Sequence, residues 1–155
     1  MENLERILRD HPIVAGLSPE HVSLLVGCAS NVVFKAGEFI FREGDDADSF
    51  YVIRQGKVVL ETYVPHMGPK AIQTRVAGEV TGWSWMVEPY RWHFDARALE
   101  LTKAIALDGK CLREKCEKDH DLGYALIKKF FGIIAQRLEA TQLQLMDIYR
   151  TNSHD

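Results

Sequence analysis

Three things are scarce in this sequence: cysteine, long apolar runs and unbalanced positive charge. The 155 residues contain only three cysteines, Cys28, Cys111 and Cys116, with no CxxC spacing. An odd number of widely placed cysteines is typical of proteins from a reducing cytoplasm, which is the location we expect. At Cys28 in particular we expect a small buried hydrophobe rather than a reactive or metal-bound thiol.

The missing apolar runs and positive charge exclude two classes of protein. No stretch is long enough to span a bilayer and the first residues do not form a signal peptide, so we expect no membrane association. The net charge is -3 and the pI is near 6.1, which leaves no basic footprint for nucleic acid. A helix-turn-helix domain of several dozen further residues is also absent, and we therefore expect no direct DNA binding.

Residues that form catalytic or metal sites do not occur at the spacing those sites require. The six histidines are scattered, and none pairs with another histidine or a cysteine at ligand spacing. Neither a phosphate loop nor a serine–histidine–aspartate arrangement is recognisable. A cupin-type jelly-roll enzyme needs two nearby histidines and a carboxylate, and only His93 lies in a suitable region. We therefore expect no enzyme, and a jelly-roll enzyme is the least favoured alternative.

The chain does contain a series of short strands between two helical ends. Residues 18–20, Ser-Pro-Glu, form a helix N-cap, a first-turn proline and an early acidic residue. Short apolar strands follow at regular spacing, with turn glycines at positions 37, 44, 56 and 68. This pattern predicts an antiparallel barrel or jelly roll, because a parallel sheet would require crossover helices.

The stretch from Lys35 to Val58, KAGEFIFREGDDADSFYVIRQGKV, resembles the cyclic-nucleotide-binding domain of catabolite-activator-type regulators, kinase regulatory subunits and gated channels. The resemblance covers roughly residues 15–145. It implies a mainly β protein, an eight-stranded antiparallel jelly-roll β-barrel with N-terminal helices and a long C-terminal helix. Within this one structural domain we expect N-terminal helices in residues 1–30, the jelly roll in 31–107, and a short and a long helix in 108–150.

The family resemblance also implies a position for a ligand. The phosphate-binding cassette of the family begins with Gly-Glu, continues with a short helix and ends with an arginine before small residues on a strand. Gly78-Glu79 matches the start, so the resemblance assigns Glu79 to the ribose hydroxyl and the helix to residues 82–86. The match from Arg97 onward places Trp92 at the position of the phosphate arginine. The candidate ligand-binding residues are Gly78, Glu79, Gly82, Trp83, Ser84, Trp85, Arg91, Trp92 and His93.

The replacement of that arginine bears on which ligand fits. A cyclic phosphate is an anion that needs a fixed cation or several N–H donors, whereas Trp92 offers one N–H and Asp95 a repelling carboxylate. Arg91 is one residue out of register, and its side chain should point to the other face of the strand. Cyclic AMP and cyclic GMP are candidate ligands, and another small ligand, aromatic or weakly charged, is an equal alternative.

The three tryptophans, all within residues 83–92, allow two interpretations. They stack on a planar ligand and line its pocket, or they fill the core and close the pocket. The first interpretation predicts a sensor of a small molecule. The second predicts a scaffold that no longer binds a ligand and acts through protein–protein interaction.

The final helix is the most regular feature of the chain. Its apolar residues repeat at alternating spacings of four and three, which is a heptad seam, and a second stripe lies beside the seam. Two stripes predict two packing partners, the domain itself and the same helix of a second copy, although one wide stripe buried in the monomer is the alternative. The seam comprises Ile127, Phe131, Ile134, Leu138, Thr141, Leu145 and Ile148, and the second stripe Leu126, Phe130 and Ile133.

These patterns together predict a regulatory module that senses a small, cyclic-nucleotide-like molecule. We expect a homodimer formed through residues 122–148, in which the C-terminal helix passes the signal to a protein partner. The identity of the ligand and of the partner does not follow from the sequence.

Overall fold

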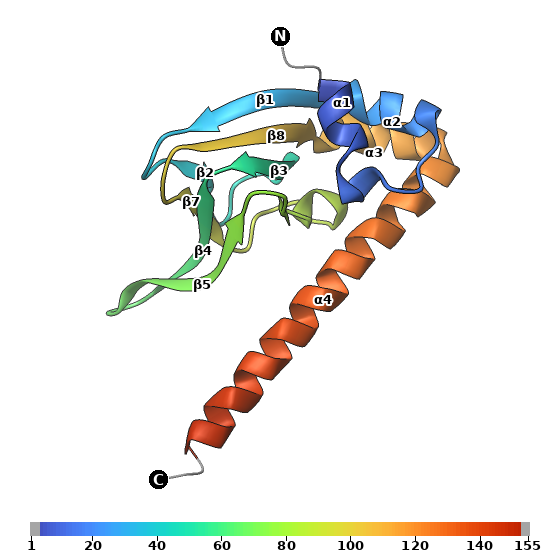
Figure 1. Cartoon of the computed structure of the whole chain (residues 1–155). Coiled ribbons are helices and arrows are strands. Elements are labelled where there is room, and N and C mark those ends of the chain that lie inside the picture. The colour runs from blue at the N-terminus through green and yellow to red at the C-terminus, as the bar shows by residue number, and fades with distance from the viewer. Residues whose placement is uncertain (1–3, 153–155) are drawn as a thin grey trace.

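The computed structural model describes residues 4–152, and antiparallel β-structure forms its centre (Figure 1). Helices precede and follow the strands, as the sequence predicts. The strands are β1 (Ala29–Phe34), β2 (Phe39–Phe41), β3 (Ser49–Gln55), β4 (Lys57–Val64), β5 (Gly68–Val76), β6 (Val80–Thr81), β7 (Asp95–Ala98) and β8 (Thr102–Asp108). The helices are α1 (Leu4–Arg9), the 3-10 turn η1 (Pro12–Val14), α2 (Pro19–Val26), the 3-10 turn η2 (Ser84–Met86), α3 (Gly109–Lys118) and α4 (His120–Asn152).

The strands form two four-stranded sheets with the orders β1-β8-β3-β6 and β2-β7-β4-β5. All named pairings are antiparallel, which confirms the mainly β class. The eight-stranded β-barrel was predicted without its division into two sheets, and these sheets are not closed into a barrel, because no pairing in the described residues joins one sheet to the other. The edge strands β6 and β2 have only two and three residues, too few to close a cylinder of hydrogen bonds.

Local chemistry explains where the chain turns. Gly56, between β3 and β4, has a φ of +102°, and a Cβ there would lie 2.5 Å from Oγ1 of Thr102. Only glycine adopts this backbone conformation and also allows this close approach. The hairpin β3–β4 consequently brings β4 under the β7–β8 turn, where Leu99 N donates to the Lys57 carbonyl at 2.8 Å.

Two hydrophobic clusters fill the interior. One lies between the β1-β8-β3-β6 sheet and the helices, with Phe50, Trp85 and Phe130 among its buried members. The other lies between the two sheets, in the space where the family resemblance implies a ligand. It consists of Phe41, Ala47, Ile53, Val58, Leu60, Trp92 and Ala96.

A disulfide links the segment after α2 to helix α3. Cys28 follows α2, Cys111 lies in the first turn of α3, and their sulfurs are bonded, with the Cα atoms 5.8 Å apart. The pairing of β1 with β8, extended by a hydrogen bond from Asp108 N to the Cys28 carbonyl, brings these distant segments together. Cys28 is buried as predicted, but its bond to a cysteine 83 residues away was not predicted from the sequence. Cys116 is a free cysteine.

Helix α4 begins where Asp119 accepts a hydrogen bond from Leu122 N at 3.2 Å. It packs beside the sheets over its first half and then extends past them (Figure 1). Leu126 and Phe130 of the second stripe are buried in the core, so this stripe packs against the domain itself. The heptad seam lies on the exposed surface, with Ile127, Phe131, Leu138, Leu145 and Ile148 all accessible.

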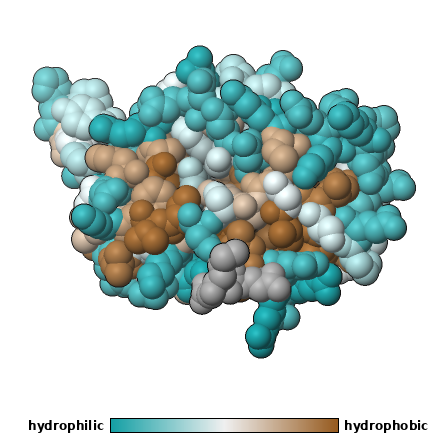
Figure 2. Space-filling model, turned by 90° about the horizontal axis from the view of Figure 1, so that it is seen from above, coloured by the Kyte–Doolittle hydropathy of each residue, from teal (hydrophilic) through white to brown (hydrophobic). Residues whose placement is uncertain are grey.

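Hydrophobic residues also reach the surface elsewhere. Seen from the side of the N-terminal helices, they gather in two areas with paler residues between them (Figure 2). Among the described residues, no helix combines the length and the apolar composition that crossing a bilayer would require.

Candidate ligand site

The cassette segment turns sharply between β6 and η2. Gly82 has a φ of +96°, and a Cβ at this position would lie 2.8 Å from Cη2 of Trp92. Trp83 follows as the residue before η2, which runs from Ser84 to Met86 within the predicted helical range of 82–86. The residue pair directly before this short helix is therefore Gly82-Trp83, whereas Gly78-Glu79 lies in the preceding β5–β6 turn.

The Trp92 indole occupies the space between the two sheets. It is 6% exposed and stacks on the Phe41 ring, with centroids 3.8 Å apart and planes 11° apart. The cavity left beside Trp92, between Phe41 and Thr81, has a volume of about 30 Å³. That is the space of about one water molecule, far below the several hundred Å³ of a pocket for a nucleotide-sized ligand.

The tryptophans divide between core and surface. Trp85 is 1% exposed and packs between Phe50 and Phe130, at centroid distances of 5.3 and 5.6 Å. Trp92 fills the space between the sheets, so two of the three tryptophans are core residues. Trp83 is half-buried, and the guanidinium of Arg137 from α4 lies 5.4 Å from its ring centroid.

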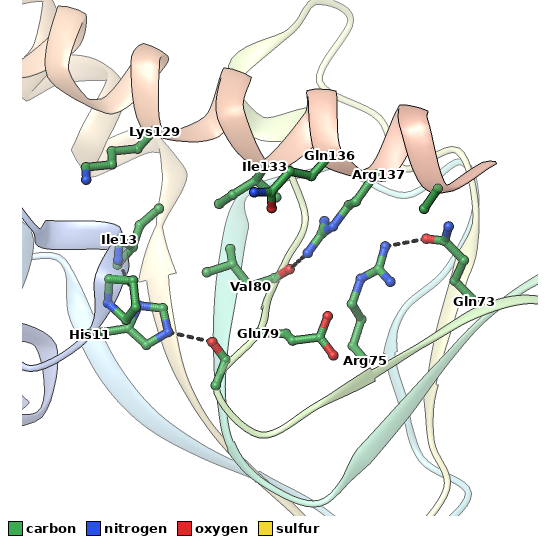
Figure 3. Close-up of a pocket in the computed structure, with 13 residues that line it drawn as sticks. His11, Ile13, Gln73, Arg75, Glu79, Val80, Lys129, Ile133, Gln136 and Arg137 are labelled. Carbon is green, nitrogen blue, oxygen red and sulfur yellow. Dashed lines mark hydrogen bonds between the residues drawn. The ribbon is translucent and has the colours of Figure 1, made fainter. Parts of the chain in front are cut away.

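A larger groove, of about 410 Å³, opens on the other side of the β5–β6 turn. Strand β5, this turn, η1 and α4 form its walls (Figure 3). The residues that line it are His11, Pro12, Ile13, Gln73, Arg75, Gly78, Glu79, Val80, Lys129, Ile133, Gln136, Arg137 and Ala140.

Two arginines from different elements meet in this groove. Arg75 on β5 is 5% exposed, and its Nη2 donates to Oε1 of Gln73 at 2.6 Å. Arg137 on α4 donates from Nη2 to the Val80 carbonyl. Burial lowers the pKa of Arg75, and burial followed by the charge of Arg75 lowers the pKa of Arg137 to about 10. Both guanidinium groups therefore remain charged at neutral pH.

Glu79 lies below the two arginines, with its carboxylate turned toward them (Figure 3). Its Oε1 accepts a hydrogen bond from Val76 N at 3.0 Å, which holds the side chain over the turn. The negative charge of Glu79 partly offsets the fall in the pKa of both arginines.

The turn is also anchored from the N-terminal side by His11. Its Nδ1 accepts from Ile13 N at 3.0 Å, so the ring proton lies on Nε2, which is 2.8 Å from the Gly78 carbonyl and donates to it.

The nine predicted site residues do not form one pocket. Gly78 and Glu79 line the groove, whereas Gly82, Trp83, Ser84, Trp92 and His93 line the small cavity. Trp85 lies in the core. Arg91 is exposed, with Nη1 2.9 Å from Oδ1 of Asp46 and 3.2 Å from the Gly44 carbonyl oxygen, so its side chain points away from Trp92.

The two arginines of the groove were not among the site residues predicted from the sequence. Arg137 continues the buried stripe of α4, one turn beyond Ile133, and a cation on an apolar stripe is a signal that was available. Arg75 is buried in a strand where its neighbours Thr74 and Val76 are exposed, and α4 forms another wall of the groove that it lines. Among the described residues, no group of three or more metal-ligating side chains is close enough to hold a metal ion.

This geometry defines a class of protein: a two-sheet β-domain whose long C-terminal helix forms one wall of a charged groove. The sequence profile of the Cyclic nucleotide-binding domain family matches residues 31–119, more than half of the chain. The chain therefore belongs to the cyclic nucleotide-binding domain family.

Individual relatives support this assignment at low identity. The chain is 23% identical over 149 residues to a CRP-like cAMP-activated global transcriptional regulator of Mycobacterium tuberculosis. That match covers 96% of the chain but 65% of the regulator. It is also 27% identical over 82 residues to human cGMP-dependent protein kinase 2, where 52% of the chain matches 11% of the kinase.

A solved structure shows the same architecture over nearly its whole length. It is a protein from Geobacter metallireducens GS-15 that is described as a cyclic nucleotide-binding protein. The two structures have a TM-score of 0.80 at 25% identity, and the superposition covers 88% of the chain and 99% of the other.

Proposed function

We propose that this protein is a regulatory module, without catalytic activity, that senses a small ligand in the groove beside α4. Members of its family in transcriptional regulators and cyclic-nucleotide-dependent kinases support a regulatory role. The carrying observation is that one helix, α4, supplies both a wall of the groove through Arg137 and the exposed heptad seam.

The ligand acts on α4 through residues that already connect the helix to the turn. Arg137 donates to Val80, the first residue of β6, and also covers Trp83. A ligand that contacts the β5–β6 turn and α4 together stabilises one orientation of the helix, because it binds that orientation more tightly. In this proposal Glu79 accepts a hydrogen bond from a ligand hydroxyl, and cyclic AMP and cyclic GMP are the first ligands to test.

The output of α4 is dimerisation through its seam. Residues 127 to 148 span about 32 Å of helix at 1.5 Å per residue, and the exposed seam residues lie along this length. Burial of this stripe against a second copy removes the apolar surface from water, and a protein partner then binds the dimer.

A thermal-shift titration with cyclic AMP, cyclic GMP, AMP and GMP tests the proposal. A ligand at a hundredfold its Kd stabilises the folded state by about 2.7 kcal/mol, which is measurable in a domain of this size. The same samples, run in sedimentation velocity, should show a change in dimerisation or in shape upon binding. Binding without any such change contradicts the role of α4.

A second function, a scaffold that binds proteins and no ligand, is favoured by one specific observation. Trp92 fills the space between the sheets and leaves about 30 Å³. The scaffold predicts that no small molecule stabilises the protein, while dimerisation through α4 persists. Stabilisation by any ligand that Glu79→Gln weakens favours the sensor instead.

A further inference from the structure

We propose that the groove binds an organic oxyanion, whose carboxylate or phosphate group lies between Arg75 of β5 and Arg137 of α4. The inference rests on the proposed function, because it names the chemical class of the ligand sensed there. It places the negative group of the ligand away from the cassette, where Trp92 provides no cation.

The hydrogen-bonding capacity of Arg75 is only partly used. Nη2 donates to Gln73 at 2.6 Å and Nη1 to the Thr74 carbonyl at 3.4 Å, but the buried Nε has no acceptor in the described part of the chain. Within the same residues 4–152, no carboxylate forms a salt bridge with either Arg75 or Arg137. Buried guanidinium groups are normally paired, whereas Glu79, the carboxylate of the groove, is not within salt-bridge distance of Arg75.

The charge of the groove favours an anion as that partner. Three cationic side chains line it, Arg75, Lys129 and Arg137, against the single carboxylate of Glu79. Arg75 and Arg137 turn their guanidinium groups toward each other across the opening (Figure 3). An oxyanion between them replaces repulsion by charge-assisted hydrogen bonds, and the guanidinium fork matches a carboxylate or phosphate in a bidentate manner.

The rest of the lining favours an organic body over a bare inorganic ion. Apolar side chains form much of the wall, namely Pro12, Ile13, Val80, Ile133 and Ala140. The volume of about 410 Å³ is within the range of small-molecule sites and far above that of one oxyanion. Because the two arginines come from β5 and α4, such a ligand links the sheet directly to the helix.

Isothermal titration calorimetry with matched pairs of compounds tests the proposal on the full chain. Benzoate is compared with benzamide, and AMP with adenosine, so that each pair differs in its anionic group. We expect the anionic member of one pair to bind and its neutral analogue not to bind. The pair that responds distinguishes a carboxylate from a phosphate ligand. Equal binding of both members of each pair, or no binding of either anion at millimolar concentration, overturns the proposal.

Substitutions locate the anion. Arg137→Gln and Arg75→Gln should each weaken binding of the anion at least about tenfold, as expected for a lost charge-assisted hydrogen bond. Arg137→Lys should retain part of the affinity, since it keeps the charge but not the fork. Arg42→Gln is the matched control, because Arg42 is exposed and lies over the Phe39 ring, outside the groove. Unchanged affinity in both groove variants overturns the proposal.

Glu79→Gln should change the affinity for an anion in the opposite direction to the arginine substitutions. Loss of its carboxylate removes repulsion, so binding of inorganic phosphate should become tighter.

If Arg75→Gln does not fold, a nitrogen–proton NMR spectrum of the wild type takes its place, because the Nε–Hε signals of the arginines report on the same site. The signal of Arg75 should move when the binding anion is added, and a spectrum without change at saturation overturns the proposal.

The failure of this inference differs from that of the proposed function. If a cyclic nucleotide binds equally well to the wild type, Arg75→Gln and Arg137→Gln, the oxyanion site is contradicted but the proposed sensor function is not. If an anion binds through both arginines without changing dimerisation or shape, the oxyanion site is supported and the proposed sensor function is contradicted.

Discussion

The indole of Trp92 stacks on the ring of Phe41, with centroids 3.8 Å apart and planes 11° apart. Phe41 lies in β2, and Trp92 lies in the loop before β7, the strand that pairs with β2. Their contact occupies the space between the sheets. Trp92 is therefore a core residue of the protein.

Removal of the indole should destabilise the protein strongly. Trp92→Ala leaves a cavity beside Phe41 and Gly82, and such truncations cost about 3–5 kcal/mol of unfolding free energy. Urea denaturation measures the loss. Phe94→Ala is the control from the same loop, because the Phe94 side chain is exposed, and it should change the stability much less. A loss below about 1 kcal/mol for Trp92→Ala contradicts the packing described above.

Dimerisation should depend on the seam of α4 and not on its hydrophobicity in general. Leu138→Glu places a charge in the seam and should convert a dimer into a monomer in sedimentation equilibrium. Leu143→Glu makes the same change on the same helix, outside the seam, and should leave the dimer intact. Leu138 and Leu143 are comparably exposed, at 57% and 62%, so exposure does not account for a difference. A dimer that survives Leu138→Glu argues against the seam.

The disulfide should be visible in a count of thiols. Without reductant, the unfolded protein should expose one reactive thiol, that of Cys116, and after reduction three. Burial raises the pKa of the Cys116 thiol, so alkylation of the folded protein at neutral pH should be slow. Because the bond joins residues 83 apart, the chain-entropy model predicts that reduction lowers the unfolding free energy by about 4.6 kcal/mol.

Three free thiols in protein isolated without reductant would show that the bond does not form where the protein is made. The cytoplasmic location stays a prediction, and this count bears on it, since disulfides are rare in that compartment.

Stability at acidic pH should depend on Asp119 at the start of α4. The hydrogen bond from Leu122 N holds the pKa of this carboxyl below its ordinary value of 3.8, and the hydrogen bond from Nε2 of His21 lowers it further. Its contribution is therefore fully present above pH 3.8 and is lost as the pH falls through the lowered pKa. Thermal unfolding of wild type and Asp119→Asn should differ at pH 5, and the difference should shrink as the pH is lowered below 3.8. Asp147→Asn, an exposed carboxylate near the other end of α4, should show no such convergence.

Local patterns accounted for much of the fold. The Ser18 cap of α2, the start of α3 after Asp108 and the two stripes of α4 depend on residues close in sequence. Such features follow from capping and periodicity, which act over one or two turns. Short strands at regular spacing predicted a jelly-roll barrel, but they do not reveal whether the edge strands of the two sheets pair.

The candidate site was predicted less completely. Glu79 and Trp92 were assigned to one pocket because the family motif is continuous in sequence, yet the turn at Gly82 directs them into two different spaces. The motif contains neither Arg75 nor Arg137. These two residues meet only because α4 packs over the end of β5, 62 positions of sequence after the first of them.

Local sequence patterns were sufficient to predict the kind of protein: a β-domain of the cyclic nucleotide-binding family whose last helix carries a heptad seam. Periodicity, turn glycines and a contiguous motif encode those properties locally. Three features became visible only in the folded structure: Trp92 fills the space between the two sheets, Cys28 is bonded to Cys111, and two arginines line one groove. Each of these depends on contacts between distant segments, whose geometry is fixed by packing and is not encoded in local patterns.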